Sequence, residues 1–395
     1  MPTWWFPYLM VFLVGLITTV LTTPLAKRIA TRLGSIDYPS ARRVNTRPTP
    51  RMGGIAMFLG LSAALAVQYC GTLYLGWPTV FIPHHTLDIN YPMLAVSVLV
   101  VFLTGFADDA KSLKPLHKFI GQTIAACIAA ASGLVIGNIV NPFGAGEMSL
   151  GWIAYPITVI YLVSFTNVIN LIDGLDGLAA GVTGIASFSL FVLTLLSGRI
   201  DACSLAIALT GCCLGFLRYN FNPASIFMGD SGSNMLGFLL GVIALLGVTR
   251  TAALTTLIVP LVIAGVPIID TFAAIVRRKR GHTSISQADK GHIQHRLINQ
   301  GFNQRQAVLL IYGWSILLSV GAFAITQVQV GPRIAIFVAL ILISAVFVAK
   351  LHLFEPVLRH YYNPKTHTDE ILPSDDPVFE QEKGAEGKEH DGGDE

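Results

Sequence analysis

The sequence predicts an all-α membrane protein that crosses the bilayer many times. Of its 395 residues, 53% are apolar and only 12% are charged, whereas soluble domains carry about 25% charged residues. Apolar runs of about 18 residues or more recur along the chain, and each can span a hydrocarbon core as a helix. Several connections between the runs are very short, so we expect a single helical bundle. This composition argues against a soluble protein with many buried helices.

About eleven transmembrane helices are predicted from these runs. They cover residues 4–25, 53–75, 91–107, 118–137, 151–169, 175–196, 202–219, 231–249, 253–276, 307–326 and 333–352. The first run has no basic segment before it and is long enough to span. We therefore expect a retained helix and not a cleaved signal peptide.

The positive charges predict how the bundle is oriented. Lys and Arg gather after the first, third and ninth predicted helices, whereas the segments 76–90 and 138–150 contain neither. Because basic loops stay in the cytoplasm, we expect the N-terminus outside and the C-terminus in the cytoplasm. The segment 355–395 is acidic and poor in apolar residues. We therefore predict a transmembrane domain over 1–354, followed by a disordered cytoplasmic tail.

Acidic and amide side chains cluster at predicted helix ends on the cytoplasmic side. Asp108 and Asp109 lie in FADDAKSLKPLHK, and Asp230 lies in YNFNPASIFMGDSGSNMLG. The stretch NVINLIDGLDGLAAG carries four polar side chains at intervals of three residues: Asn167, Asn170, Asp173 and Asp176. Because charge is costly at a membrane boundary, clustered acids there need a partner cation or a function.

These acids, together with Asn170, offer hard oxygen ligands of the kind that Mg²⁺ prefers, usually one or two carboxylates completed by substrate phosphates and water. We therefore expect Mg²⁺ as cofactor, with Mn²⁺ as a substitute. A calcium-binding EF-hand is excluded because the twelfth position counted from Asp173 is Gly184 and not Glu. A P-loop ATPase is excluded because no GxxxxGK[ST] sequence occurs.

A fourth cluster is the basic stretch RRKRGHTSISQADKGHIQHRL, which contains His282, His292 and His295. A catalytic zinc would need a third protein ligand, and no HExxH sequence occurs. The histidines and surrounding cations suit phosphate or a nucleotide sugar. Attraction to anionic lipid headgroups explains the same composition equally well.

One membrane face thus carries acids that can bind a metal and a basic loop that can bind anions. This combination suits an enzyme of phosphoryl transfer, because catalysis of that reaction depends mainly on positioning and charge neutralisation. A site level with the bilayer surface indicates one water-soluble and one lipid-borne substrate.

Five motifs resemble those of the polyprenyl-phosphate N-acetylhexosamine-1-phosphate transferase superfamily (glycosyltransferase family 4), in particular its WecA/TagO branch. They are PTPRMGG (48–54), FADD (106–109), NVINLIDGLDGLAAG (167–181), NPASIFMGDSGS (222–233) and DKGHIQHRL (289–297). The resemblance covers about residues 20 to 320. It implies transfer of GlcNAc-1-phosphate, or a related HexNAc-1-phosphate, from a UDP-sugar to undecaprenyl phosphate. UMP is released, and the lipid-linked sugar initiates cell-envelope glycan synthesis.

The resemblance also implies roles for individual residues. Asn170 and Asp230 would hold Mg²⁺. The catalytic residues would be Asp108 and Asp109 at the lipid phosphate, with Asp173 and Asp176 at the nucleotide sugar. The expected substrate-binding residues are Asn167, Lys118, Arg277, His292, His295 and Arg296. Gln294 stands where the family often has a further histidine. We hypothesise direct attack by the lipid phosphate, which the aspartate pair orients or deprotonates.

The expected location is the bacterial plasma (inner) membrane, with the active site on the cytoplasmic face. Membrane lipids are expected partners, and nucleic acids are not. The sequence is compatible with a homodimer but does not predict one. The alternatives are a phospho-MurNAc-pentapeptide translocase and, from another class, a secondary transporter with a site near the bilayer midplane. Asp270, inside 253–276, is a functional candidate by its position, but we favour a structural pair with Arg218 or Arg277.

Overall fold

The computed structural model describes residues 5–39, 47–80, 89–140, 147–248, 254–280, 291–355, 358–363 and 368–373. The helices within these ranges are α1 (Trp5–Arg32), α2 (Gly54–Tyr74), α3 (Tyr91–Lys111), α4 (Pro115–Ala131), α5 (Ala154–Ile172), α6 (Leu178–Leu196), α7 (Ile200–Asn220), α8 (Gly229–Val248), α9 (Leu254–Ile263), α10 (Gly265–Arg280), α11 (Ile293–Asn299), α12 (Gln304–Gln327) and α13 (Val330–Lys350). The strands in the described ranges form three antiparallel pairs: β1 (Ile36–Asp37) with β2 (Thr49–Pro50), β3 (Asn138–Val140) with β4 (Glu147–Ser149), and β5 (Leu358–Asn363) with β6 (Thr368–Pro373).

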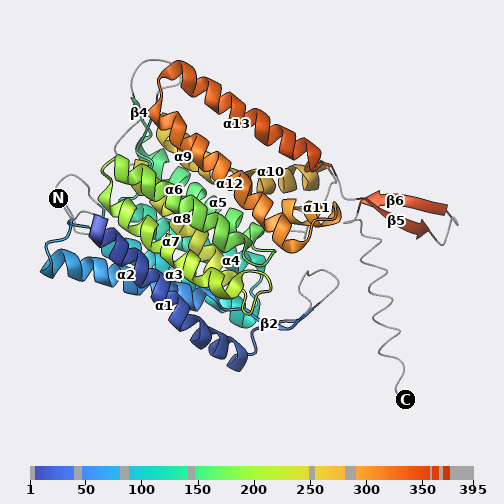
Figure 1. Cartoon of the computed structure of the whole chain (residues 1–395), viewed down its shortest axis with the longest axis horizontal. Helices are drawn as coiled ribbons and strands as arrows, with labels where there is room; N and C mark the ends of the chain where they lie inside the picture. The colour runs from blue at the N-terminus through green and yellow to red at the C-terminus, as the bar shows by residue number, and fades with distance from the viewer. Residues whose placement is uncertain are drawn as a thin grey trace. The chain divides into compact units, whose positions relative to one another are not determined.

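The chain divides into two compact units. Unit 1 comprises residues 1–268 and 303–340, and unit 2 comprises residues 269–302 and 341–395. The helices of unit 1 run alongside one another (Figure 1). This arrangement confirms the predicted all-α, polytopic membrane fold.

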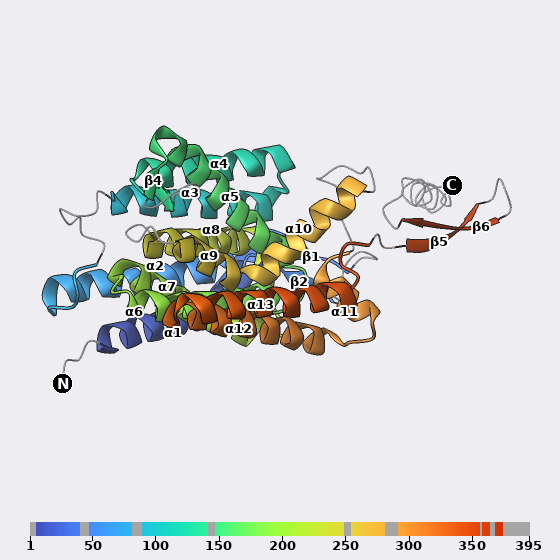
Figure 2. The same cartoon turned by 90° about the horizontal axis from the view of Figure 1, so that it is seen from above.

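Helix α8 forms the centre of unit 1. It packs against α2, α3, α5, α6, α7 and α9, and Figure 2 shows it between α3 and α7. Close packing against α5 depends on Gly237, where a Cβ atom would lie 2.5 Å from the carbonyl oxygen of Phe165. Small residues at such crossings let helices approach closely in lipid. The start of α8 is thereby held among the ends of its neighbours.

Nine helices in the described ranges are long and apolar enough to cross a membrane. The predicted run 118–137 corresponds to α4, which has only 17 residues. The predicted run 253–276 is interrupted at Ala264, between α9 and α10. Pro267 contributes to this break because it cannot donate a backbone hydrogen bond to the preceding turn. The total of eleven spans and the orientation stay predictions.

The start of the tail differs from the disorder predicted from residue 355. Strands β5 and β6 pair in antiparallel register from Leu358 opposite Pro373 to Asn363 opposite Thr368. The first part of the tail contains Tyr361, Tyr362 and Ile371, which are residue types that favour strands. The composition of the whole tail concealed this local preference. The predicted boundary at 354 stays a prediction, and 374–395 lie outside the described residues.

Candidate active site

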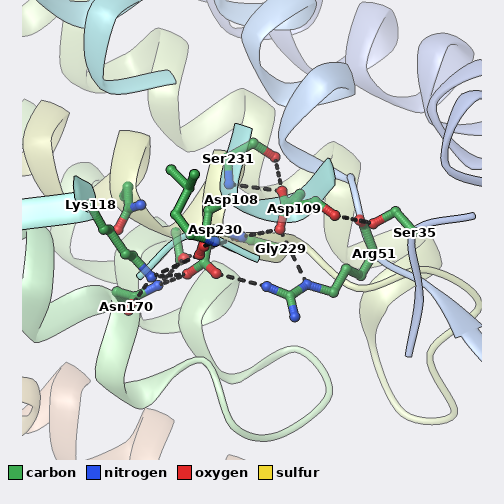
Figure 3. A network of polar contacts seen from close by, with 12 residues as sticks. Ser35, Arg51, Asp108, Asp109, Lys118, Asn170, Gly229, Asp230 and Ser231 are labelled. Carbon is green, nitrogen blue, oxygen red and sulfur yellow. Dashed lines mark hydrogen bonds and ion pairs between the residues drawn. The ribbon is translucent and has the colours of Figure 1, made fainter. Parts of the chain in front are cut away.

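Polar side chains from five segments of unit 1 meet at the start of α8 (Figure 3). They come from the end of α3, the first turns of α4, the end of α5, the first turn of α8 and the segment before α2. We call this group the Asp230 cluster: Arg51, Asp108, Asp109, Lys118, Asn170 and Asp230. Five of its members, the three aspartates, Asn170 and Lys118, belong to stretches that the sequence placed on one membrane face.

Asp109 joins the end of α3 to the start of α8. Its Oδ1 accepts a hydrogen bond from the backbone N–H of Asp230 at 2.8 Å, and its Oδ2 accepts from the Ser231 N–H at 2.9 Å and the Ser231 hydroxyl at 2.6 Å. The first N–H groups of a helix have no partner within the helix. A negative charge at this end also interacts favourably with the helix dipole. The Asp109 side chain is 0% exposed. Asp109 therefore caps α8 from outside that helix.

Glycines allow α3 and α8 to approach this closely. Gly229 has a φ of 73°, and a Cβ atom on it would lie 2.5 Å from Oδ2 of Asp109. A Cβ atom on Gly105 would lie 2.3 Å from the carbonyl oxygen of Asp230. A side chain at either position would push the two helix ends apart. The positive φ of Gly229 is also a conformation that other residues rarely adopt.

Arg51 links two carboxylates of the cluster. Its Nε lies 3.2 Å from Oδ1 of Asp109 and its Nη2 lies 2.7 Å from Oδ2 of Asp230. The Arg51 backbone is fixed as well, because it forms a β-bridge with Phe227, whose N–H donates to the Pro50 carbonyl at 2.8 Å. Sequence reasoning recognised the PTPRMGG motif but gave Arg51 no role. The sequence signal that could have identified Arg51 is that it is the single charged residue of this motif and lies close to two glycines.

Lys118 is the second cation of the cluster. Its Nζ lies 2.6 Å from Oδ1 of Asp230, 3.3 Å from Oδ2 of Asp108 and 3.5 Å from Oδ1 of Asn170. Asp108 also accepts a hydrogen bond from the Leu113 N–H at 2.6 Å. The Asn170 amide donates to Asp230 and, at 2.8 Å, to Ser233. Three oxygens from three helices thus converge on one positive charge.

Asp173 and Asp176 follow α5 and have different surroundings. Burial raises the pKa of the Asp173 carboxyl to about 7, the negative charge of Asp230 adds to this rise, and Arg51 opposes it. Asp176 instead accepts hydrogen bonds from the Asn222 side chain and the Ala224 N–H, both at 2.9 Å. Asp173 can therefore exchange a proton near neutral pH, whereas Asp176 holds the loop that leads to α8.

Asn167 lies one turn before Asn170 and bonds to protein groups. Its amide donates to the Gln122 side chain at 2.7 Å and to the Val163 carbonyl at 2.9 Å. Gln122 also lies 3.3 Å from Oδ1 of Asn234. These contacts tie α5 to α4 and α8, which is a bracing arrangement. The predicted substrate contact of Asn167 stays a prediction.

The other predicted substrate-binding residues belong to unit 2. Asp270 on α10 accepts from the Ile293 N–H at 2.8 Å, and its Oδ2 lies 2.8 Å from Nδ1 of His292. The described ion pair of Asp270 is thus with His292, not with the arginines that we expected. A carboxylate at Nδ1 fixes the ring and leaves Nε2 for another partner.

Three further predicted residues of unit 2 can be placed locally. The guanidinium groups of Arg277 and Arg296 donate to the carbonyls of Leu353 and Glu355, respectively. His295 lies on α11. That these residues act together with the Asp230 cluster stays a prediction, and His282 lies outside the described residues.

The chain matches the model of glycosyl transferase family 4 over residues 91–248, a range that contains every member of the Asp230 cluster except Arg51. It is 38% identical over 354 residues to a probable undecaprenyl-phosphate N-acetylglucosaminyl 1-phosphate transferase of Bacillus subtilis, with 89% of this chain and 95% of the relative covered. A decaprenyl-phosphate N-acetylglucosaminephosphotransferase of Mycobacterium tuberculosis is 33% identical, covering 89% of this chain and 91% of the relative. A phospho-N-acetylmuramoyl-pentapeptide-transferase of Desulforamulus reducens is 31% identical, covering 78% and 91%.

Proposed function

Because the chain belongs to glycosyl transferase family 4, we propose that it transfers GlcNAc-1-phosphate from UDP-GlcNAc to a polyprenyl phosphate and releases UMP. Undecaprenyl phosphate is the proposed acceptor, as in the name of the Bacillus subtilis relative. The observation that carries the proposal is the convergence of Asp108, Asn170 and Asp230 with two cations at the ends of helices. Such a site can hold a divalent ion and phosphates side by side.

The donor chemistry of the cluster fits Mg²⁺. Within the described ranges, no three His, Cys, Asp or Glu side chains form a metal site on their own. Mg²⁺ needs fewer, because it usually binds one or two carboxylates and takes its other ligands from substrate phosphates and water. The oxygens of Asp230, Asn170 and Asp108 already surround a positive charge, the Lys118 ammonium. We assign Asp230 and Asn170 as the ligands. When bound, the ion would neutralise negative charge on the pyrophosphate of the sugar nucleotide.

Direct attack by the lipid phosphate needs little help from a base. One of its oxygens bonds to the β-phosphorus of UDP-GlcNAc, the bond from that phosphorus to the bridging oxygen breaks, and UMP leaves with the electron pair. A phosphate monoester has its second pKa at about 6 and is mostly dianionic at neutral pH. Asp108 orients this acceptor. Asp173, with a pKa of about 7, can take up a remaining proton.

Asp109 is unsuited to nucleophilic attack. Both of its carboxylate oxygens accept hydrogen bonds from the start of α8, and the side chain is fully buried. An attacking carboxylate must instead reach the substrate with a free oxygen. We therefore assign Asp109 to positioning, and Asp108 to the lipid phosphate. A covalent phospho-enzyme trapped on either residue would contradict direct attack.

We place the site at the cytoplasmic face of a bacterial plasma membrane. The cluster forms where helices end, as expected for a site that takes a water-soluble and a lipid-borne substrate. The distribution of Lys and Arg between the loops supports this orientation.

The donor sugar can be tested with purified protein, undecaprenyl phosphate and Mg²⁺. We expect UMP release with UDP-GlcNAc and little release with UDP-MurNAc-pentapeptide, when each sugar nucleotide is supplied alone. Preference for the pentapeptide substrate would favour the translocase hypothesis. This is the second candidate function, because of the similarity to the Desulforamulus reducens relative. Protein that releases no UMP but moves a solute across proteoliposomes would instead be a transporter.

A further inference from the structure

The Lys118 ammonium contacts both residues to which we assign the metal, as well as Asp108. Its shortest contact, 2.6 Å, is to Oδ1 of Asp230, and its other acceptors are Oδ2 of Asp108 and Oδ1 of Asn170. These are hard oxygen donors that suit Mg²⁺. An ammonium and a divalent ion cannot both contact Oδ1 of Asp230 without strong repulsion between their charges.

The two cations of the cluster are held very differently. Arg51 pairs with both Asp109 and Asp230, and its backbone is bridged to Phe227. It binds Oδ2 of Asp230, so it can stay in place while Oδ1 takes another ligand. Arg51 is therefore the fixed cation.

The Lys118 ammonium can move away from Asp230. Lys118 projects from the first turns of α4, a helix whose N-cap residue, Lys114, makes no side-chain capping bond. Its ammonium is shared among three acceptors, and a lysine head group is a point charge on a flexible four-carbon stem. A rotation within that stem can carry the charge away from Asp230 without moving the helix.

We infer that Lys118 and the divalent ion compete for Oδ1 of Asp230, so that binding of the ion releases the ammonium toward substrate phosphate. This inference rests on the proposed function, because it takes the metal site from it. It assigns Lys118 two successive partners. Before metal binding, the ammonium neutralises Asp230 and Asp108. Afterwards, it is a phosphate-binding group beside the metal. Oδ1 of Asp230 therefore contacts a cation at every stage, first the Lys118 ammonium and then the metal ion. The ammonium becomes available to the substrate only when the metal is bound.

The test is the affinity of the substrate-free protein for Mn²⁺, measured by titration calorimetry in detergent. Lys118→Met removes the competing charge at nearly constant length, and we expect it to bind Mn²⁺ about tenfold more tightly than the wild type. That factor corresponds to a site occupied by the ammonium about nine-tenths of the time. The same variant is expected to lose most of its transfer activity, because the released ammonium is then missing.

Lys114→Met is the matched control. It removes the same charge from an exposed residue four positions earlier in the same segment, so its Mn²⁺ affinity should stay within about twofold of wild type. An equal gain in Mn²⁺ affinity in both variants would mean that the loss of any nearby positive charge is sufficient, and it would overturn the inference. Unchanged or weaker Mn²⁺ binding by Lys118→Met would overturn it as well. Should Lys118→Met fail to fold, Lys118→Gln gives the same comparison. If neither wild type nor variant binds Mn²⁺, the metal site itself is wrong, whereas UMP release by the wild type tests the proposed reaction separately.

Discussion

Asp230→Asn is expected to lower the transfer rate by about a thousandfold or more, with the fold retained. The Asp230 carboxylate contacts Arg51, Lys118 and Asn170, so it positions both cations and the other assigned metal ligand. Asparagine has the same shape, and the backbone N–H that bonds to Asp109 is unaffected. The loss should therefore fall on charge and metal binding, measured as UMP release per folded protein.

Asp201→Asn is the matched control for this variant. Asp201 is also an acidic residue in the first turn of a transmembrane helix, and its carboxylate accepts a hydrogen bond from the Tyr91 hydroxyl at 2.6 Å. Removing its charge should leave the transfer rate within a few-fold of wild type. Mg²⁺-dependent transfer by Asp230→Asn at more than a tenth of the wild-type rate would refute the role of Asp230 as a metal ligand.

Asp109→Asn is expected to destabilise the protein much more than Asp108→Asn does. An amide at position 109 cannot replace the charge that pairs with Arg51, and it cannot accept hydrogen bonds through both of its terminal atoms. Breaking a buried ion pair from one side costs about 3 kcal/mol. Asp108 is less committed, because its carboxylate accepts one backbone hydrogen bond, from the Leu113 N–H, and its other described partners are the side chains of Lys118 and Asp230. We expect Asp108→Asn to cost about 1 kcal/mol or less.

The two variants therefore separate stability from activity. Thermal unfolding in detergent should show a clearly lower midpoint for Asp109→Asn, whereas Asp108→Asn should unfold near the wild-type temperature and yet transfer little sugar phosphate. Equal midpoints, or the reverse order, would show that Asp109 does not serve as the external cap of α8.

The division of labour between Asp108 and Asp109 could not be predicted from their sequence. They are neighbours in one motif, and composition treats them alike. Successive residues of a helix point about 100° apart. At the end of α3, this difference directs Asp109 toward the start of α8 and Asp108 toward Lys118. Only the packing of α3 against α8 and α4 shows which carboxylate is which.

Local patterns predicted most of the fold and most members of the cluster, because long apolar runs and polar groups at their ends are visible within short segments. Arg51 was missed because its partners, Asp109 and Asp230, are 58 and 179 positions away in the chain. The bracing contacts of Asn167 and Asp176 were hidden for the same reason, since Gln122 and Asn222 lie on other segments. Contacts between distant segments depend on tertiary packing.

The proposed reaction is tested most directly by following the two phosphates of the donor. UDP-GlcNAc labelled differently at its α- and β-phosphorus is incubated with the purified protein, undecaprenyl phosphate and Mg²⁺, and lipid and water phases are separated. We predict the β-label in the lipid phase together with GlcNAc, and the α-label in UMP. Retention of both labels in UDP while the sugar enters the lipid would mean transfer of the sugar alone, and would contradict the proposed reaction.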